Sequence, residues 1–333
     1  MRAAVVRTHG PIEAIELVPD YPRPDPEPGW VRIRVSACSL NYHDLFSRRG
    51  MPGIKLPLPL IIGSDIAGTV DQSGDDVEGY STGDRVLIDP MYRGRGMIGE
   101  SWDGGRAEYC VAHASQLVSM PDAVSFEAAA SIPLAYATAH RMMVTRGQVT
   151  GADTVLVMGA SGGVGTACAL LAKRAGATVI ACASSQHKLD RLAELGADEG
   201  INYVEQDMRK AVWDLVGKPR ISGEGGVNLL VNCTGGGTWS DSIRCLKTGG
   251  RLVTCGATAG FDEAIDVRYV WTFEHSLMGS NGWRRSDIES LLDYAADGSL
   301  VPVIDKVMNL SEVHEAERLM ENRQIFGKIV LIP

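Results

Sequence analysis

The pattern of apolar and polar residues differs between the first part of the chain, before residue 125, and the part that follows Thr154, and it predicts different secondary structure in each. Before residue 125, short segments alternate apolar and polar residues between turns rich in proline and glycine. In one of them, Val31, Ile33 and Val35 lie on a single face of a strand. From Thr154 onward, continuous apolar runs alternate with segments of helical composition, as in parallel strands joined by helices. We therefore predict an α/β fold with a doubly wound parallel sheet.

A glycine-rich turn at residues 159–165, GASGGVG, follows the first apolar run of this sheet and precedes a helical segment. The strand, turn and helix N-terminus together present free backbone N–H groups to an anion. The turn is one residue longer than the strict G-x-G-x-x-G spacing, and a flexible loop is the alternative. We predict that a dinucleotide pyrophosphate binds there, at Ser161, Gly162, Gly163 and Val164.

The length and composition are those of a globular protein of two domains, with 333 residues, 45% hydrophobic and 22% charged. A net charge of −9 disfavours nucleic acid and anionic membranes as partners. We see no signal peptide and no apolar run of membrane-spanning length. The seven cysteines form no C-x-x-C pair, which disfavours a disulfide framework and favours a cytoplasmic location.

Several motifs occur in the order that is typical of one family. They are LNYHD, GSDIAG, GDRV, GASGGVG, LGAD, INY and GKIVL. In these motifs the chain resembles the medium-chain dehydrogenase/reductase superfamily, and especially its quinone oxidoreductase branch. The resemblance implies a Rossmann domain, residues 125–283, inserted between the two parts of a β-rich GroES-like catalytic domain, residues 1–124 and 284–333.

The resemblance also bears on metal binding. It aligns the three catalytic zinc ligands of related alcohol dehydrogenases with Asn41, Ser64 and Leu134, none of which is a good zinc ligand. Residues 91–105, which correspond to the lobe that holds a structural zinc, contain no cysteine. His43, Asp44 and Asp65 could build another metal site, but no sulfur or second imidazole is near them in the sequence. We expect no metal.

Without a metal, the reaction needs a hydrogen-bond donor for the acceptor and a source of protons. The polar cluster Asn41, Tyr42 and His43 lies at the active-site position that the resemblance implies. His43 is the preferred proton donor because imidazole titrates near neutral pH. The alternatives are Tyr42 as the proton donor, a surface histidine with Tyr42 packed inward, or a proton from solvent. Met51-Pro52 stands where related enoyl reductases carry a tyrosine.

The choice of cofactor depends on the end of the second strand of the parallel sheet. NAD-specific folds carry an acidic residue there, and this chain carries Ala183. Ser184, Ser185 and Lys188 could bind the 2′-phosphate of NADPH, and the resemblance implies that Tyr203 joins them. In the alternative, Lys188 is a solvated helix residue. We predict NADPH.

Other cofactor contacts are expected beyond the carboxyl ends of parallel strands, with further positions implied by the resemblance. They are Thr138, Asn232, Thr234, Cys255, Gly256 and Lys328, together with Asn41.

The predicted function is NADPH-dependent hydride transfer to a small molecule, namely a quinone, an enone or another activated C=C or C=O acceptor. We place the reaction between the two domains. A zinc-independent alcohol or carbonyl dehydrogenase and a non-catalytic, crystallin-like NADPH-binding protein are the alternatives. The apolar strand at 276–279 predicts a homodimer, or a tetramer, through strand pairing at the sheet edge.

Overall fold

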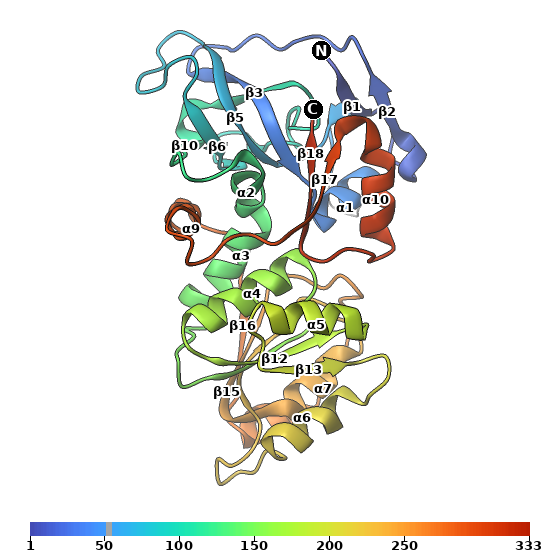
Figure 1. Cartoon of the computed structure of the whole chain (residues 1–333). Coiled ribbons are helices and arrows are strands. Elements are labelled where there is room, and N and C mark those ends of the chain that lie inside the picture. The colour runs from blue at the N-terminus through green and yellow to red at the C-terminus, as the bar shows by residue number, and fades with distance from the viewer. Residues whose placement is uncertain (51–54) are drawn as a thin grey trace. The chain divides into compact units, whose positions relative to one another are not determined.

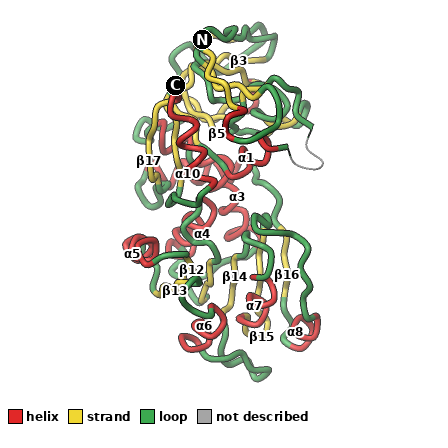
Figure 2. Tube along the Cα trace, turned by 90° about the vertical axis from the view of Figure 1, so that its right-hand side faces the viewer, coloured by secondary structure: helices red, strands yellow, loops and turns green. Residues whose placement is uncertain are grey.

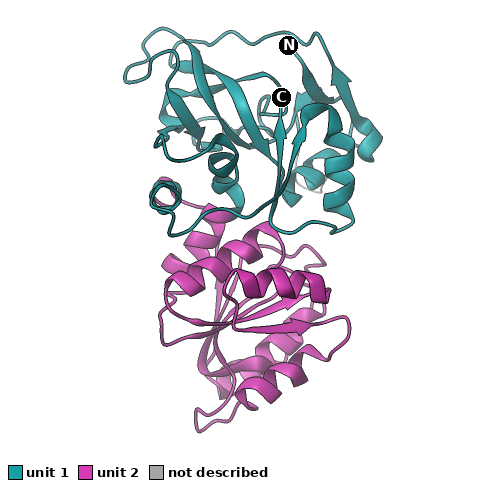
Figure 3. Ribbon diagram, in the orientation of Figure 1, with its two compact units in different colours: residues 1–135, 288–333 teal, residues 136–287 magenta. Residues whose placement is uncertain are grey.

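The chain forms two compact units in the computed structural model, which describes residues 1–50 and 55–333 (Figure 1). Unit 1 comprises Met1–Ala135 and Ile288–Pro333, and unit 2 comprises Tyr136–Asp287 (Figure 3). Unit 2 is therefore an insertion between two parts of unit 1. The first boundary lies after Ala135 instead of residue 124, because helix α2 (Phe126–Ala130) packs on strands of unit 1. The second lies after Asp287 instead of residue 283.

Unit 1 consists mainly of strands, as the alternating segments before residue 125 predicted for that part of the chain. Near its N-terminus, β1 pairs antiparallel with β2. A larger sheet has the order β10-β6-β5-β3-β18-β17, with β9 also paired to β3. The strands of unit 1 are β1 (Ala3–Val6), β2 (Ile15–Val18), β3 (Trp30–Ser39), β4 (Leu60–Ile61), β5 (Asp65–Ser73), β6 (Arg85–Ile88), β7 (Met91–Tyr92), β8 (Gly96–Met97), β9 (Tyr109–His113), β10 (Leu117–Ser119), β17 (Ile304–Asn309) and β18 (Lys328–Ile332).

The C-terminal strand joins the sheet formed by the N-terminal part of the chain. In β18, Val330 pairs with Ser39 of β3, and the backbone N–H of Leu40 donates to Ile329 at 2.9 Å. The first residue of β18, Lys328, is consequently held near the segment that follows β3. The remaining helices of this part are α1 (Tyr42–Arg49), α10 (Val313–Glu321) and α9 (Arg285–Ala296), which begins at the end of unit 2.

Helix α1 begins where the sequence places the candidate catalytic residues. Asn41 is its N-cap residue in extended backbone conformation, and Asp44 Oδ2 accepts a hydrogen bond from the Asn41 backbone N–H at 2.9 Å. The helix ends at Gly50, whose φ of +80° is readily adopted only by glycine. Asp44 therefore caps the N-terminus of the helix through its carboxylate.

Unit 2 contains a six-stranded parallel sheet in the order β13-β12-β11-β14-β15-β16. This is the doubly wound order, in which successive strands are added toward one edge from β11 to β13 and toward the other edge from β14 to β16. Figure 2 shows the helices packed around the strands. The α-helices and strands of unit 2 are α3 (Ala137–His140), β11 (Thr154–Val157), α4 (Gly163–Arg174), β12 (Thr178–Ala183), α5 (Gln186–Glu194), β13 (Glu199–Asn202), α6 (Met208–Val216), β14 (Val227–Val231), α7 (Thr238–Cys245), β15 (Leu246–Thr254), α8 (Val267–Thr272) and β16 (Ser276–Gly279).

None of the helices formed by residues 1–50 and 55–333 is long and apolar enough to cross a membrane.

A buried ionic network joins α1 to α10 within unit 1. Arg106 contacts Asp44 at 3.0 Å and Glu317 at 2.6 Å, and Arg48 contacts Glu317 at 2.8 Å. All four side chains are almost completely buried. Burial disfavours both charges, but the carboxylates raise the pKa of Arg106, and the two guanidinium groups lower the pKa of Glu317. The network fixes the orientation of α1 in unit 1.

Replacement of Glu317 by Gln tests the network. The change leaves Arg48 and Arg106 without a full counter-charge in the interior, so the free energy of unfolding should fall by about 3–5 kcal/mol. Urea denaturation at neutral pH measures it. Glu315→Gln is the matched control on the same helix: Glu315 is half exposed and pairs with exposed Arg318, so its replacement should cost less than about 1 kcal/mol. Equal losses in both variants would contradict the role assigned to Glu317.

Candidate active site

The glycine-rich turn of unit 2 has the geometry of an anion site. Gly159, directly after the strand, has a φ of +63°, and α4 begins at Gly163 with Gly162 as its N-cap residue. No side chain caps this end of the helix. The backbone N–H groups of the first turn and the positive end of the helix dipole are therefore directed at a ligand position. This geometry fits the pyrophosphate that the sequence predicted.

Close packing explains two of the glycines. A Cβ atom on Gly165 would lie 2.3 Å from the carbonyl oxygen of Gly159, so only glycine allows α4 to approach the turn. A Cβ atom on Gly159 would lie 3.3 Å from Thr234 Oγ1. Thr234 therefore lies beside the turn, where the strand order reverses between β11 and β14.

The residues predicted to bind the 2′-phosphate meet at the carboxyl ends of β12 and β13. Ala183, the last residue of β12, accepts a hydrogen bond from the Tyr203 backbone N–H at 3.2 Å. Ser185 is the N-cap of α5, and its Oγ accepts from the Lys188 backbone N–H at 3.4 Å. Ser184 and Lys188 are half-buried and Tyr203 is exposed. The structure thus brings this predicted set together, and Ala183 contributes no carboxylate to it.

Asn232 uses its side chain to bind the loop that follows it and helix α7. Its Oδ1 accepts from the N–H groups of Thr234 and Gly235, and its Nδ2 donates to Thr238 and Ser242, all at 2.9–3.1 Å. This fills the hydrogen-bonding capacity of the amide. A direct cofactor contact of the Asn232 side chain stays a prediction, which this geometry does not favour.

The other predicted contacts of unit 2 lie around the same end of the sheet. Cys255 and Gly256 follow β15, the strand that neighbours β14. Thr138 lies buried on α3, and α3 packs against α4.

In unit 1, Lys328 organises the segment that carries Asn41. Its buried Nζ donates to the Leu40 carbonyl at 2.7 Å, Asn41 Oδ1 at 2.6 Å and Asp65 Oδ2 at 3.2 Å. An ammonium group has three N–H donors, and these three oxygens use all of them. A direct contact of Lys328 with the cofactor stays a prediction. In this structure the ammonium has no N–H group left to donate to a cofactor.

The contact with Lys328 uses the side-chain oxygen of Asn41 and leaves its amide nitrogen, Nδ2, without a partner among the described residues. Because an ammonium only donates, the Asn41 oxygen must face Lys328, and Nδ2 then points elsewhere. Nδ2 is buried and has no hydrogen-bond partner among the described residues. Such a donor costs about 1–3 kcal/mol when it stays unpaired. It fits a ligand oxygen, such as a nicotinamide carboxamide or a substrate carbonyl.

His43 pairs with a carboxylate that sequence reasoning did not single out. Its Nε2 is hydrogen bonded to Glu100 Oε1, and Glu100 also accepts from Ser47 Oγ at 3.3 Å. Burial favours the neutral imidazole, but the hydrogen bond and charge of Glu100, with the charge of Asp44, outweigh it and raise the pKa of His43. Burial opposes the Glu100 charge, yet His43 lowers the pKa of Glu100. The pair therefore shifts the imidazole of His43 toward its protonated form.

Tyr42 packs toward the interior. Its ring makes an edge-to-face contact with Phe46, one turn later in α1, with ring centroids 5.3 Å apart. It also joins the core cluster that contains Leu40 and Leu45. This corresponds to the inward packing considered as an alternative for Tyr42, whereas His43 points to Glu100. The Met51-Pro52 position, also noted in the sequence, lies outside the described residues.

The three positions that the family resemblance aligns with zinc ligands lie in one region of unit 1. The Leu134 backbone N–H donates to Asp65 Oδ1 at 2.9 Å, Asp65 binds Lys328, and Lys328 binds Asn41. Ser64, beside Asp65, has a buried hydroxyl without a protein partner among the described residues. These donors do not fit a catalytic zinc, which takes three nitrogen, sulfur or carboxylate ligands.

The alternative metal site is not assembled either. Asp44 binds Arg106, Asp65 binds Lys328 and His43 binds Glu100. Over residues 1–50 and 55–333, no group of three or more His, Cys, Asp or Glu side chains could hold a metal ion.

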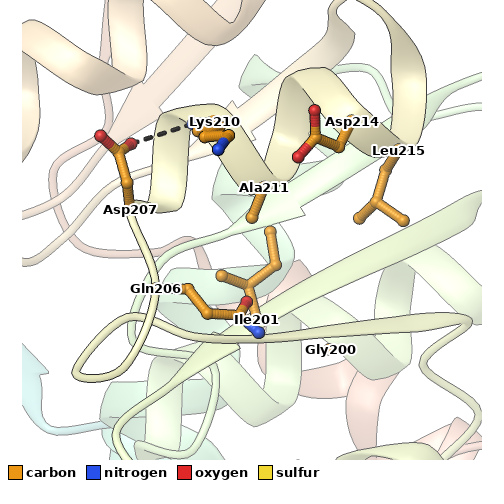
Figure 4. Close-up of a pocket in the computed structure, with 8 residues that line it drawn as sticks. All are labelled: Gly200, Ile201, Gln206, Asp207, Lys210, Ala211, Asp214 and Leu215. Carbon is orange, nitrogen blue, oxygen red and sulfur yellow. Dashed lines mark hydrogen bonds between the residues drawn. The ribbon is translucent and has the colours of Figure 1, made fainter.

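A surface pocket of about 460 Å³ lies elsewhere in unit 2, between β13 and α6 (Figure 4). Asp207 caps α6 there by accepting from the Lys210 backbone N–H at 2.9 Å. None of the predicted cofactor or catalytic residues lines this pocket, so we do not assign the reaction to it. Its lining consists of Gly200, Ile201, Gln206, Asp207, Lys210, Ala211, Asp214 and Leu215.

Sequence reasoning missed the partners that orient the candidate catalytic residues. Glu100 lies 57 residues from His43, in a glycine-rich segment without a local signal. Asp65 did carry a signal, since a carboxylate inside the apolar run GSDIAG requires a buried partner. That the partner is Lys328, 263 residues away, is a property of the fold.

Family models match both units. Residues 27–122 match an alcohol dehydrogenase GroES-like domain, and residues 163–297 match a zinc-binding dehydrogenase domain. Quinone oxidoreductase-like protein 2 of Bos taurus is 31% identical over 321 residues, covering 93% of this chain and 86% of that protein.

Solved structures are similar over the whole chain. One, described as an NAD-dependent alcohol dehydrogenase, is 38% identical with a TM-score of 0.93, and the match covers 100% of both chains. Another, a 2-octenoyl-CoA carboxylase reductase in complex with NADP and 2-octenoyl-CoA, is 27% identical with a TM-score of 0.86. It matches 96% of this chain and 82% of its own.

Proposed function

We propose that this chain, which belongs to the medium-chain dehydrogenase/reductase superfamily and is quinone oxidoreductase-like, reduces a quinone, an enone or another activated C=C or C=O acceptor with NADPH and without zinc. Relatives in this superfamily are oxidoreductases that use a nicotinamide cofactor. The observation that carries the proposal is the unpaired, buried Asn41 Nδ2 on the helix that also presents the His43–Glu100 pair.

In the proposed reaction, the reduced nicotinamide supplies a hydride when it is bound to unit 2. Asn41 donates a hydrogen bond to a carbonyl oxygen and so stabilises negative charge that develops there. His43, whose protonated form is favoured by Glu100, gives a proton to the acceptor. Lys328 keeps the Asn41 amide in the donating orientation.

The preference for NADPH rests on the end of β12. Ala183 neither binds a ribose 2′-hydroxyl nor repels a 2′-phosphate, and Ser184 and Lys188 lie within the adjoining segment. The similar structures point both ways, since one is described as NAD-dependent and another contains NADP. The side chains at this position favour NADPH, because phosphate gains charge-assisted hydrogen bonds with a lysine.

Lys188→Ala tests the cofactor choice. Loss of one charge-assisted contact should weaken NADPH binding by about 1.5–3 kcal/mol, or roughly 10- to 150-fold, and leave NADH binding nearly unchanged. Fluorescence titration with both nucleotides measures this. Lys210→Ala on α6 removes the same charge away from the proposed site and should alter neither affinity. Equal affinities of the unaltered protein for NADPH and NADH would refute the proposal.

The proton transfer can be tested by single-turnover kinetics with saturating NADPH. His43→Ala should slow reduction by about 10²- to 10⁴-fold while NADPH still binds, and Tyr42→Phe should change the rate little. Because His43 must be protonated to donate, the rate should fall as pH rises through its pKa. Unchanged rates in both variants would assign the proton to solvent.

A second variant separates the positioning role of Glu100 from a loss of structure. Glu100→Gln removes the charge that raises the pKa of His43, so the falling limb of the pH profile should move to lower pH. Glu108→Gln, at a carboxylate paired with Arg2 instead of His43, should leave the limb in place. The same limb position in both variants would contradict the proposed pair.

Zinc independence is supported by the charge of Lys328. Its ammonium lies 2.6 Å from Asn41 Oδ1, at one of the positions aligned with zinc ligands, and would repel a cation. The hydroxyl of Ser64 and the side chain of Leu134 add no strong ligand.

Elemental analysis of the purified protein should therefore find no stoichiometric zinc, and activity should survive incubation with a chelator. One zinc per chain, lost together with activity on chelation, would contradict this part of the proposal.

Assembly as a homodimer is supported by the edge of the parallel sheet. Among the strands of the described residues, β16 is hydrogen bonded to β15 alone, and the segment Ser276–Gly279 contains no proline or lysine. Leu277 on this strand is 37% exposed, and Trp271 on the preceding helix is 70% exposed. Pairing two copies of β16 around a twofold axis would cover both edges.

Light scattering at micromolar concentration should give at least a dimer. Leu277→Lys places a charge on the proposed interface and should shift the protein toward monomer. Ile221→Lys, which replaces an exposed apolar residue elsewhere in unit 2, should leave the assembly unchanged. A monomeric unaltered protein would rule the interface out.

An alcohol or carbonyl dehydrogenase activity is the second candidate, favoured by the 38% identity to the structure described as an NAD-dependent alcohol dehydrogenase. Consumption of NADPH with a quinone, an enone, an enoyl-CoA ester and aldehydes separates the two. Reduction of aldehydes alone would favour the dehydrogenase, and nucleotide binding without turnover would favour a non-catalytic protein.

A further inference from the structure

Two cysteines face each other at the carboxyl end of the parallel sheet in unit 2. Cys233 follows β14 and Cys255 follows β15, and the strands pair with Val231 opposite Val253. Each cysteine is two residues beyond its paired valine, so the shared register places them side by side. Their Sγ atoms are 3.3 Å apart.

The pair differs from the other cysteines in its access to solvent. Cys233 and Cys255 are partly exposed, whereas Cys38, Cys110, Cys168, Cys182 and Cys245 are buried. The Cys255 thiol is hydrogen bonded to Cys233 Sγ, and this bond, opposed by burial, lowers the pKa of Cys233. The same contact and burial raise the pKa of Cys255. Cys233 is therefore the better nucleophile of the two.

We propose that Cys233 and Cys255 form a redox-active pair that a hydroperoxide converts to a reversible disulfide. The Cys233 thiolate attacks the peroxide oxygen, which gives a sulfenic acid and releases water or an alcohol. The Cys255 sulfur then attacks the sulfenic sulfur and displaces water. Two thiols are oxidised and one peroxide is reduced, and the two thiol protons end in the released products.

The backbone already provides most of the geometry for this bond. Neighbouring strands lie about 4.8 Å apart, within the Cα separation of roughly 4.4–6.8 Å that disulfides span. The sulfur atoms must approach by about 1.3 Å, from the observed 3.3 Å to a bond of about 2.05 Å. Side-chain rotation of the two cysteines supplies movements of this size without a change in strand register.

The disulfide would join two segments that the proposed function assigns to the dinucleotide. Thr234 adjoins Cys233 in sequence and lies beside the glycine-rich turn, and Gly256 directly follows Cys255. An effect of oxidation on nucleotide affinity therefore rests on the proposed function, whereas formation of the disulfide does not.

To test this, the protein is treated with hydrogen peroxide, and free thiols are then blocked under denaturing conditions. Mass spectrometry identifies the linked peptides. We expect one linkage, Cys233 to Cys255, that dithiothreitol reverses, while the five buried cysteines stay free. In Cys255→Ser, Cys233 should instead stop at a sulfenic acid that dimedone traps. Cys233→Ala should abolish both products.

The outcomes separate the two proposals. Free thiols at Cys233 and Cys255 after treatment, or linkage between other cysteines, would overturn the redox pair. NADPH titration of the reduced protein tests the proposed function independently of this result. If the linked protein binds NADPH more weakly than the reduced protein, and dithiothreitol restores its affinity, the disulfide also controls the nucleotide site. Unchanged affinity would overturn that control.

Discussion

Two arginine side chains without solvent exposure, Arg48 and Arg106, require carboxylates within reach, because an unpaired buried charge costs several kcal/mol. Glu317 forms ion pairs with both arginines, and Asp44 forms a further ion pair with Arg106. This constraint connects the first helix of unit 1 to the last one. Asp44 also accepts from the backbone of the helix N-cap residue. The buried ionic network therefore holds the candidate catalytic residues at the start of α1 in place, although the network itself takes no part in the proposed chemistry.

A second buried charge, the ammonium of Lys328 in β18, acts on the same segment. The return of β18 to β3 brings Lys328 to Asp65 and to the oxygen of Asn41. The ammonium satisfies one end of the amide and leaves the other as an unpaired buried donor. Unit 1 thus holds a polar group ready for a ligand oxygen, at the stability cost that an unsatisfied donor carries. In unit 2, the analogous unsatisfied groups are backbone N–H groups at the start of α4, since no side chain caps this helix.

The sequence predicted the elements better than the contacts. The strand-rich part before residue 125 and the alternation of parallel strands and helices from Thr154 onward were expected, because strand and helix periodicity are local properties of the chain. In residues 91–105, the only strands are the two-residue strands β7 and β8. The lack of a local pattern in this segment concealed Glu100, because the role of Glu100 depends on where the segment folds back toward His43.

What the sequence determined by itself was the glycine turn, the absence of an acidic residue at the end of β12 and the polar cluster at residues 41–43, since each is a matter of residue type at a fixed place in a local motif. Only the tertiary structure decided which polar atoms remain unsatisfied. Asn232 and Lys328 looked like cofactor contacts in the sequence, but their hydrogen bonds are filled by neighbouring protein groups. The pairing of Glu100 with His43, and of Cys233 with Cys255, likewise depends on residues 57 and 22 positions apart meeting in the fold. Hydrogen bonds and thiol contacts act over a few ångströms, and sequence separation does not encode such distances.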